Sequence, residues 1–252
     1  MKARIVASSR GPRWLAEGWR LFLAAPVGWI ALVFAYWLMM TLVSIVPLVG
    51  IAVASILVPA FSVGFMAAAR AASHKGRVEL PMLFDGFRHA PRSQVALGIV
   101  YLACLAAVLG GSALADEGGL ARWMLTGRRP EEEVLQSDEF ALALVVAAGL
   151  YAPVMMMFWF APPLAAWHSV TPGKSLFFSF FACLMNWRAF LAYGAATAAV
   201  ALVAPFLLLF ALRAIAGAGS SAWLVLPLLT VLLPTLFASF YASYRDVFAG
   251  EG

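Results

Sequence analysis

Long uncharged stretches of apolar residues recur along the chain, and short charged segments separate them. Each stretch has about the twenty residues that a helix needs to cross a hydrocarbon layer roughly 30 Å thick. The stretches cover residues 27–46, 48–69, 93–115, 140–163, 189–212 and 222–244. Because the first two are together too long for one crossing, we expect a tight hairpin at Pro47. The pattern predicts an all-α, polytopic membrane protein with six transmembrane helices.

Three shorter amphipathic segments precede the odd-numbered spans. They cover residues 12–23, residues 81–89 and a stretch that opens at Pro172. In the first segment, Arg13, Glu17 and Arg20 share one helical face, and Trp14 belongs to the apolar face. We expect all three segments to be short helices that lie in the membrane interface on the cytoplasmic side. A further short helix is expected at residues 120–125.

The even-numbered spans end with a common interval between a proline and a basic residue. The interval runs from Pro59 to Arg70, from Pro234 to Arg245 and, more loosely, from Pro163 to Lys174. The sequence therefore predicts a threefold repeat of interfacial helix, span and span, within a single membrane domain, 1–252. The repeat units are residues 12–72, 81–170 and 172–246. Prolines and arginines are common near membrane ends, so the intervals alone leave a chance recurrence open.

The charges of the connecting segments predict the orientation of the chain. The segments 1–26, 70–92, 164–188 and 245–252 together hold 13 Lys or Arg and 5 Asp or Glu. The alternate loops, 116–139 and 213–221, hold 4 Lys or Arg and 7 Asp or Glu. Since basic loops stay on the cytoplasmic side, both termini are expected in the cytoplasm.

The composition supports lipid rather than water as the main solvent of this chain. Hydrophobic residues make up 64% of it and charged residues 12%, against roughly 45–50% and about 25% in a soluble domain. The net charge of +5 is spread over the ends of the apolar stretches and forms no patch of the kind that binds nucleic acid. We expect the lipid bilayer and its anionic headgroups as partners, and no nucleic acid.

Catalytic chemistry has little support in the residues. No acidic, basic or histidine residue lies in the middle of a predicted span, where such a group would mark a transport or proton pathway. His74, His89 and His168 have no metal-ligand spacing. The run Met155–Met157 could bind Cu(I) through its thioethers, although methionine is also an adaptable apolar packing residue. We therefore expect no cofactor, no metal and no enzymatic activity.

Basic and aromatic residues on the cytoplasmic side are the candidates for contact with a lipid or a partner protein. They are Arg70, Lys174, Arg245, Arg13, Arg20 and Trp14. If the repeat holds, the first three form a basic ring that suits anionic headgroups or the acidic residues of a partner. Ordinary anchoring of basic residues at the cytoplasmic face explains them equally well. Pairs of small residues such as Gly194 and Ala198 also favour close helix packing or a homo-oligomer.

Several motifs resemble one family of membrane proteins. They are Gly18-Trp19-Arg20-Leu21-Phe22, Pro26-Val27-Gly28-Trp29, the stretch from Pro59 to Arg70, and Leu83-Phe84-Asp85-Gly86-Phe87-Arg88. The chain resembles uncharacterised integral inner-membrane proteins of betaproteobacteria and their relatives, most strongly over residues 10–125. That family is loosely similar to the membrane domain found beside some glycerophosphodiester phosphodiesterases. The resemblance implies a multi-pass protein of the bacterial inner membrane and transfers no active site.

Two functions are compatible with the sequence. The lack of ionisable residues within the spans favours a non-enzymatic scaffold or accessory subunit that binds another membrane protein or lipid. The alternative is a transporter or channel for a small or amphipathic solute, with proline-broken helices as its gate. A polar cavity at membrane depth would favour the transporter, whereas a dry bundle with an exposed apolar flank would favour the scaffold.

Overall fold

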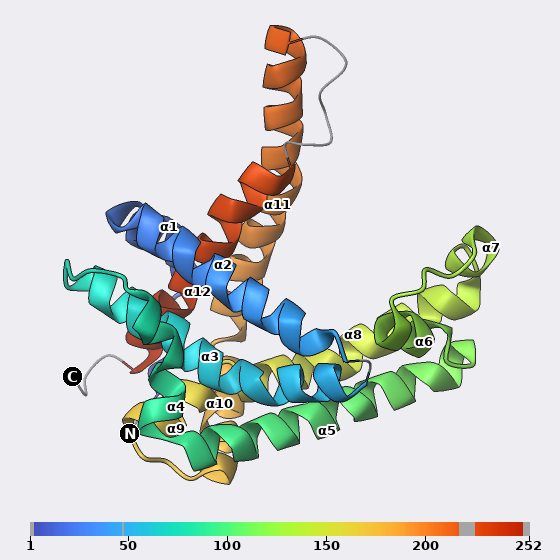
Figure 1. Cartoon of the computed structure of the whole chain (residues 1–252), viewed down its shortest axis with the longest axis horizontal. Coiled ribbons are helices and arrows are strands. Elements are labelled where there is room, and N and C mark those ends of the chain that lie inside the picture. Colours follow the sequence, from blue (N-terminus) through green and yellow to red (C-terminus); the bar gives the residue numbers. More distant parts are fainter. Residues whose placement is uncertain (1–2, 47, 217–224, 249–252) are drawn as a thin grey trace. The chain divides into compact units, whose positions relative to one another are not determined.

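The structure is a computed structural model that describes residues 3–46, 48–216 and 225–248. Every regular element in this part of the chain is a helix (Figure 1), as the sequence predicts. Along the chain they are α1 (Arg10–Ala24), α2 (Pro26–Ser44), α3 (Val49–Ser73), the 3₁₀ helix η1 (Leu80–Phe84), α4 (Asp85–His89), α5 (Pro91–Asp116), α6 (Gly119–Thr126), α7 (Glu132–Leu135), α8 (Asp138–Phe158), α9 (Ala161–Trp167), α10 (Pro172–Met185), α11 (Trp187–Ala216) and α12 (Val225–Phe248).

Within the described residues, five helices are long and apolar enough to cross a membrane. They are α2, α3, α5, the stretch Asp138–Trp167 formed by α8 and α9, and the part of α11 from Trp187 to Leu207. These helices match the first five predicted spans. The sixth predicted span falls on α12, and its residues 222–224 lie outside the described residues. The predicted loop 213–221 lies mostly outside them as well.

Local sequence explains where several helices begin and end. α2, α5 and α10 each begin at a proline, whose fixed φ and missing N–H suit the first helical position. Between α2 and α3, Leu48 has a φ of 60°, and a Cβ on Gly50 would overlap the carbonyl oxygen of Val43. The chain therefore turns tightly at the predicted hairpin, although Pro47 itself lies outside the described residues.

Contacts divide the chain into two compact units. Unit 1 consists of Met1–Trp37, Gly64–Asp85 and Ala182–Gly252, and unit 2 of Leu38–Val63 and Gly86–Phe181. α2, α3 and α10 contribute residues to both units. The single domain expected from the sequence remains a prediction.

In unit 1, α1 packs against α11 and α12. Its buried face carries Trp14, Leu15 and Phe22. A Cβ on Gly18 would overlap the carbonyl oxygen of Thr235, so only glycine permits this distance between the backbones of α1 and α12. The first predicted short helix is thus present, and its buried face packs on two longer helices; its place in the membrane interface stays a prediction.

In unit 2, α5 and α8 pack side by side (Figure 1). Leu97 of α5 is fully buried against Ala161 and Ala165 of α9, and the hydroxyls of Tyr101 and Tyr151 lie 3.1 Å apart. Since Leu97 near the start of α5 meets α9 beyond the end of α8, α5 and α8 run in opposite directions.

The other predicted short helices are also present. η1 and α4 cover the segment 81–89, α10 begins at Pro172, and α6 occupies the stretch predicted at 120–125. At the small residue Gly194, the position that a Cβ would take has no described atom within 4 Å beyond the adjacent residues and backbone of α11 itself. Close helix contacts occur at Gly18, Gly86 and Gly98, and at Gly111, where a Cβ would overlap the side chain of Leu150.

Candidate functional site

A cluster of charged side chains joins the start of α1 to the end of α12 in unit 1. The guanidinium of Arg10 donates to both carboxylate oxygens of Asp246, at 2.5 and 2.6 Å. The indole Nε1 of Trp14 donates to Oδ2 of the same carboxylate at 2.7 Å. Glu17 accepts from Arg10 at 3.1 Å and pairs with Arg245. The side chain of Asp246 is 13% exposed, so protein donors rather than water satisfy most of its hydrogen-bonding capacity.

The cluster contains two permanent positive charges, those of Arg10 and Arg245. The hydrogen bond to Asp246 is the main cause that raises the pKa of Arg10 above its ordinary value, and burial opposes it. A guanidinium is protonated at every working pH. Arg10 therefore holds the carboxylates of Asp246 and Glu17 together as a fixed structural charge and offers no acid–base chemistry.

Residues 4–6 form a short strap across unit 1. The backbone N–H of Arg4 donates to the carbonyl oxygen of Val247 at 2.8 Å. The N–H of Val6 donates to Oδ1 of Asn186 at 2.8 Å, and Nδ2 of Asn186 donates to the carbonyl oxygen of Arg4 at 3.0 Å. Asn186, at the junction of α10 and α11, is buried. The strap therefore ties the N-terminal segment to both α12 and this junction.

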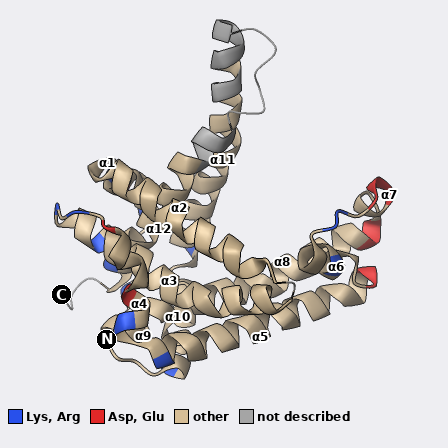
Figure 2. Cartoon of the chain, viewed as in Figure 1, with Lys and Arg blue, Asp and Glu red and all other residues tan. Residues whose placement is uncertain are grey.

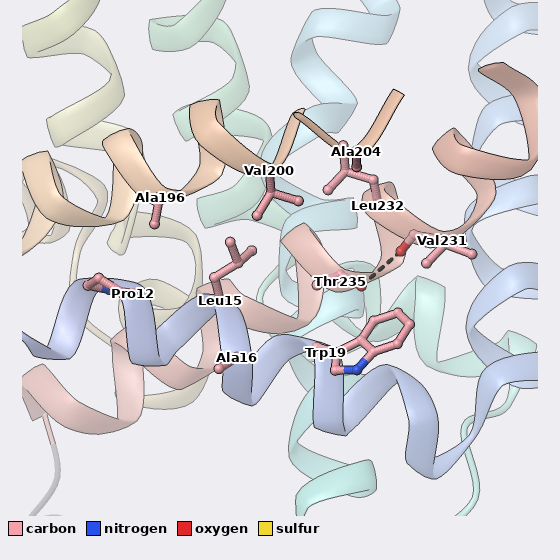
Figure 3. A pocket seen from close by; sticks show the side chains of 10 residues that line it. All are labelled: Pro12, Leu15, Ala16, Trp19, Ala196, Val200, Ala204, Val231, Leu232 and Thr235. Atoms are coloured by element: carbon pink, nitrogen blue, oxygen red, sulfur yellow. Dashed lines mark hydrogen bonds between the residues drawn. The ribbon is translucent and has the colours of Figure 1, made fainter. Parts of the chain in front are cut away.

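An apolar groove lies beside α1, and we call it the α1 groove. It has a volume of about 500 Å³. It is lined by Pro12, Leu15, Ala16 and Trp19 of α1, Ala196, Val200 and Ala204 of α11, and Val231, Leu232 and Thr235 of α12 (Figure 3). The hydroxyl of Thr235 donates to the carbonyl oxygen of Val231 at 2.8 Å (Figure 3). The wall of the groove is therefore almost entirely apolar.

Arg13 and Arg20 lie on α1 next to the α1 groove. Both are exposed, and neither forms an ion pair within the described part of the chain. At 100° per residue, the two arginines share one face of α1, adjacent to the face that carries Pro12, Ala16 and Trp19. Two exposed positive charges therefore border one side of the apolar groove.

Trp14, unlike Arg13 and Arg20, is not exposed on the surface of α1. It is fully buried, and its ring lies 5.2 Å from that of Phe190 and 6.0 Å from that of Tyr193. The predicted role of Trp14 as a lipid or partner contact had assumed that the apolar face of α1 meets lipid. Here α11 covers that face, so Trp14 is not part of the exposed surface of α1.

The predicted basic ring is divided between the two units. Arg70 and Arg245 belong to unit 1 and Lys174 to unit 2, and all three are exposed. Arg245 pairs with Glu17. The ring remains a prediction, since each residue is described only within its own unit.

Unit 2 contains polar groups at the break between α8 and α9. The hydroxyl of Ser179 accepts from the backbone N–H of Phe160 at 2.9 Å and donates to the carbonyl oxygen of Met156 at 2.7 Å. Gln94 is buried, and its Nε2 donates to the carbonyl oxygen of Pro162 at 2.9 Å. Within the described residues, Oε1 of Gln94 has no hydrogen-bond partner. These side chains satisfy backbone groups that the broken helix leaves open.

Charges also separate along the α5–α8 hairpin of unit 2 (Figure 2). Arg88 and Arg92 lie just before and at the start of α5. The acidic residues Glu131–Glu133, Asp138 and Glu139 lie at or near the start of α8, in α7 and beside it. Because the two helices run in opposite directions, Arg88 and Arg92 lie at one end of the hairpin and these acidic residues at the other, where Arg129 pairs with Glu132.

The described part of the chain contains no group of three or more His, Cys, Asp or Glu side chains that could hold a metal ion.

The sequence interpretation missed Asp246 and the pairing of Glu17. The signal for Asp246 was weak, because it lies 236 positions from Arg10 and no periodic pattern connects the two.

One comparison with known proteins finds a relative of nearly full length. A probable inner membrane protein of Burkholderia thailandensis is 40% identical over 249 residues, which cover 96% of this chain and 92% of the relative. No family model matches the chain, and no solved structure matches it. The match agrees with the resemblance to inner-membrane proteins, whereas the similarity to the domain beside phosphodiesterases remains a prediction.

Proposed function

We propose that this chain, which belongs to the family of the probable inner membrane protein of Burkholderia thailandensis, is a non-enzymatic scaffold or accessory subunit of the inner membrane. It binds another membrane protein or lipid through apolar surfaces that the chain itself leaves uncovered. The observation that carries this proposal is the exposure of α11, where only 6% of the most apolar stretch is buried.

The exposed surface of α11 is large and continuous. Leu191, Leu202, Val203, Phe206 and Leu207 are each more than half exposed. α2 is similar, with 11% of its apolar stretch buried. In a bilayer these faces meet lipid or a second protein, since an apolar patch of this extent is not stable in water. Most of α11 is exposed rather than packed in the core of the protein. Such a helix suits a subunit whose apolar surface is covered by a partner.

We also propose that α12 is the sixth span and that both termini lie in the cytoplasm. The charge separation along the α5–α8 hairpin supports this orientation, because its basic end follows the rule for cytoplasmic segments. Alkaline phosphatase fused after Arg128 is then expected to be active, since it folds only outside the cytoplasm. Fusion after Arg77 is expected to be inactive, and fluorescent protein at the C-terminus is expected to fluoresce. The reverse pattern would contradict the orientation.

Two equivalent contacts support the threefold repeat. A Cβ on Gly18 would overlap the carbonyl oxygen of Thr235, and one on Gly86 would overlap that of Ala60. Thr235 and Ala60 each follow the proline that opens the repeated interval. Both glycines follow an acidic residue and precede an aromatic residue, with an arginine two positions on. In the third repeat, Ser179 of α10 contacts the α8–α9 break. Each short helix thus packs on a proline-containing even span.

One observation favours the alternative of a transporter or channel. The buried Oε1 of Gln94 has no partner within the described residues, and it lies beside the proline-rich break before α9, where backbone carbonyls are free of helix bonds. Uptake of a radiolabelled solute into vesicles, lost in Gln94→Leu, would support transport.

The test of the proposed function is extraction of the wild-type protein from its own membrane into native lipid discs, followed by mass spectrometry. A membrane protein in a fixed molar ratio, or a specific lipid, is the expected result. Discs that hold only this chain and bulk lipid in the proportions of the whole membrane would overturn the scaffold.

A further inference from the structure

The α1 groove has the size and lining of a lipid-chain site. Its volume of about 500 Å³ falls within the range of roughly 300–1,000 Å³ that is usual for small-molecule sites. Its ten lining residues come from α1, α11 and α12 of unit 1, so one compact unit forms the whole wall (Figure 3). The groove is open along one side, and Trp19 at its edge is 41% exposed.

A transmembrane helix is a poor fit to this volume. An α-helix about 10 Å wide with a pitch of 5.4 Å fills roughly 400 Å³ per turn. The α1 groove would therefore hold little more than one helical turn. A fatty acyl chain is narrower, and the small side chains of Ala16, Ala196 and Ala204 leave a slot between the three helices. The shape of the groove favours a lipid chain over a partner helix.

The charges beside the groove favour an anionic headgroup. Arg13 and Arg20 are exposed and carry no ion pair within the described residues. Arg10, on the same helix, is already neutralised by Asp246 and Glu17. Two uncompensated guanidinium groups on the border of an apolar slot complement a phosphate that carries an acyl chain.

We propose that the α1 groove binds one acyl chain of an anionic phospholipid, whose phosphate is held by Arg13 and Arg20. This inference rests on the proposed function and deepens it, because it names the lipid class and the place where it binds. The lipid seals the open side of the groove between α1, α11 and α12.

The test is native mass spectrometry of the delipidated full-length protein with an equimolar mixture of phosphatidylglycerol and phosphatidylcholine that have identical chains. Wild type is expected to bind phosphatidylglycerol preferentially. The double variant Arg13→Gln, Arg20→Gln is expected to reduce that preference by about fivefold per arginine, the factor that corresponds to about 1 kcal/mol per basic residue. The double variant Arg122→Gln, Arg128→Gln removes the same charge elsewhere and is expected to keep the preference.

The acyl-chain part of the proposal is tested with a matched pair of variants on α11. Ala196→Trp fills the groove and is expected to lower the bound fraction of both lipids at least tenfold. Ala198→Trp places the same side chain two positions on, on a face that does not line the groove, and is expected to bind as wild type does. A thermal melt in detergent checks that both variants fold, and the arginine variants test the site independently of any change in packing.

Each outcome decides the proposal. Equal binding by Ala196→Trp and Ala198→Trp, or an unchanged lipid preference without Arg13 and Arg20, would overturn it. Loss of a co-purified polypeptide or of a dimer in Ala196→Trp, with lipid binding unaffected, would assign the groove to a protein helix. A stoichiometric protein partner in native discs together with these negative results would leave the proposed scaffold intact, so the two failures are distinguishable.

Discussion

Replacing Asp246 with alanine is expected to lower the free energy of unfolding by about 3 kcal/mol. The variant removes the carboxylate that accepts two hydrogen bonds from Arg10 and one from the indole of Trp14. Trp14 is fully buried, so its N–H would lose its partner in a place that water reaches poorly, which is the costly way to break a hydrogen bond. The unfolding free energy in mild detergent, measured by titration with sodium dodecyl sulfate, checks the prediction.

Two further variants serve as controls for the loss of Asp246. Asp246→Asn keeps one acceptor oxygen and the shape of the side chain, and it is expected to cost about half as much. Glu132→Ala breaks the ion pair between Arg129 and Glu132, whose side chains are 66% and 67% exposed. This variant is expected to lower the free energy of unfolding by less than about 0.5 kcal/mol. If Asp246→Ala is as mild as Glu132→Ala, the cluster contributes no more than a surface ion pair.

The sequence predicts the helices of this protein well because one rule governs them. In a bilayer the backbone N–H and C=O groups must be satisfied within the protein, and a helix does so within a single segment, so an uncharged stretch of about twenty apolar residues predicts a helix. The stretch 93–115 became α5, Pro91–Asp116, within a few residues at each end. The short helix predicted at 120–125 is present as α6, although it is too short for this rule.

For α1, the sequence predicts which residues share a face but not what each face contacts. Helical periodicity correctly placed Trp14 and Arg13 on different faces, but it could not say what each face meets. Hydropathy treats a lipid tail and an apolar helix as the same surroundings, so Trp14 could be assigned to the interface when α11 in fact covers it. Arg13 keeps an exposed position, although Glu17 on the same face pairs with Arg245 of α12.

Contacts between distant segments were not predictable from periodicity at all. Arg10 and Asp246 are 236 positions apart, and each looks like an ordinary basic or acidic residue near a membrane end. Their pairing depends on α1 lying along α12, which follows from the close backbone contact at Gly18. The proline–arginine interval pointed to the relevant part of α12 without revealing that the first short helix of the chain packs on its last span.

Gly18→Ala is expected to destabilise the protein by about 2–3 kcal/mol, near the upper end for overpacking. The added Cβ would overlap the carbonyl oxygen of Thr235 and would lie 2.8 Å from the Cβ of Ser239. The carbonyl is part of the α12 backbone and cannot rotate away, so α1 must move outward. That movement would also lengthen the ion pairs between α1 and α12, which join Arg10 to Asp246 and Glu17 to Arg245. The same detergent titration measures the loss.

Gly194→Ala provides the matched control, because its added Cβ meets no described atom within 4 Å beyond the adjacent residues and backbone of α11 itself. Alanine favours the helix over glycine, so this variant is expected to be neutral or up to about 1 kcal/mol more stable. Gly86→Ala, whose Cβ would overlap the carbonyl oxygen of Ala60, is expected to lose as much stability as Gly18→Ala, since the two glycines occupy equivalent positions in the proposed repeat. A large loss for Gly18→Ala with none for Gly86→Ala would mean that their similar contacts are not equivalent, and the repeat would lose its structural support.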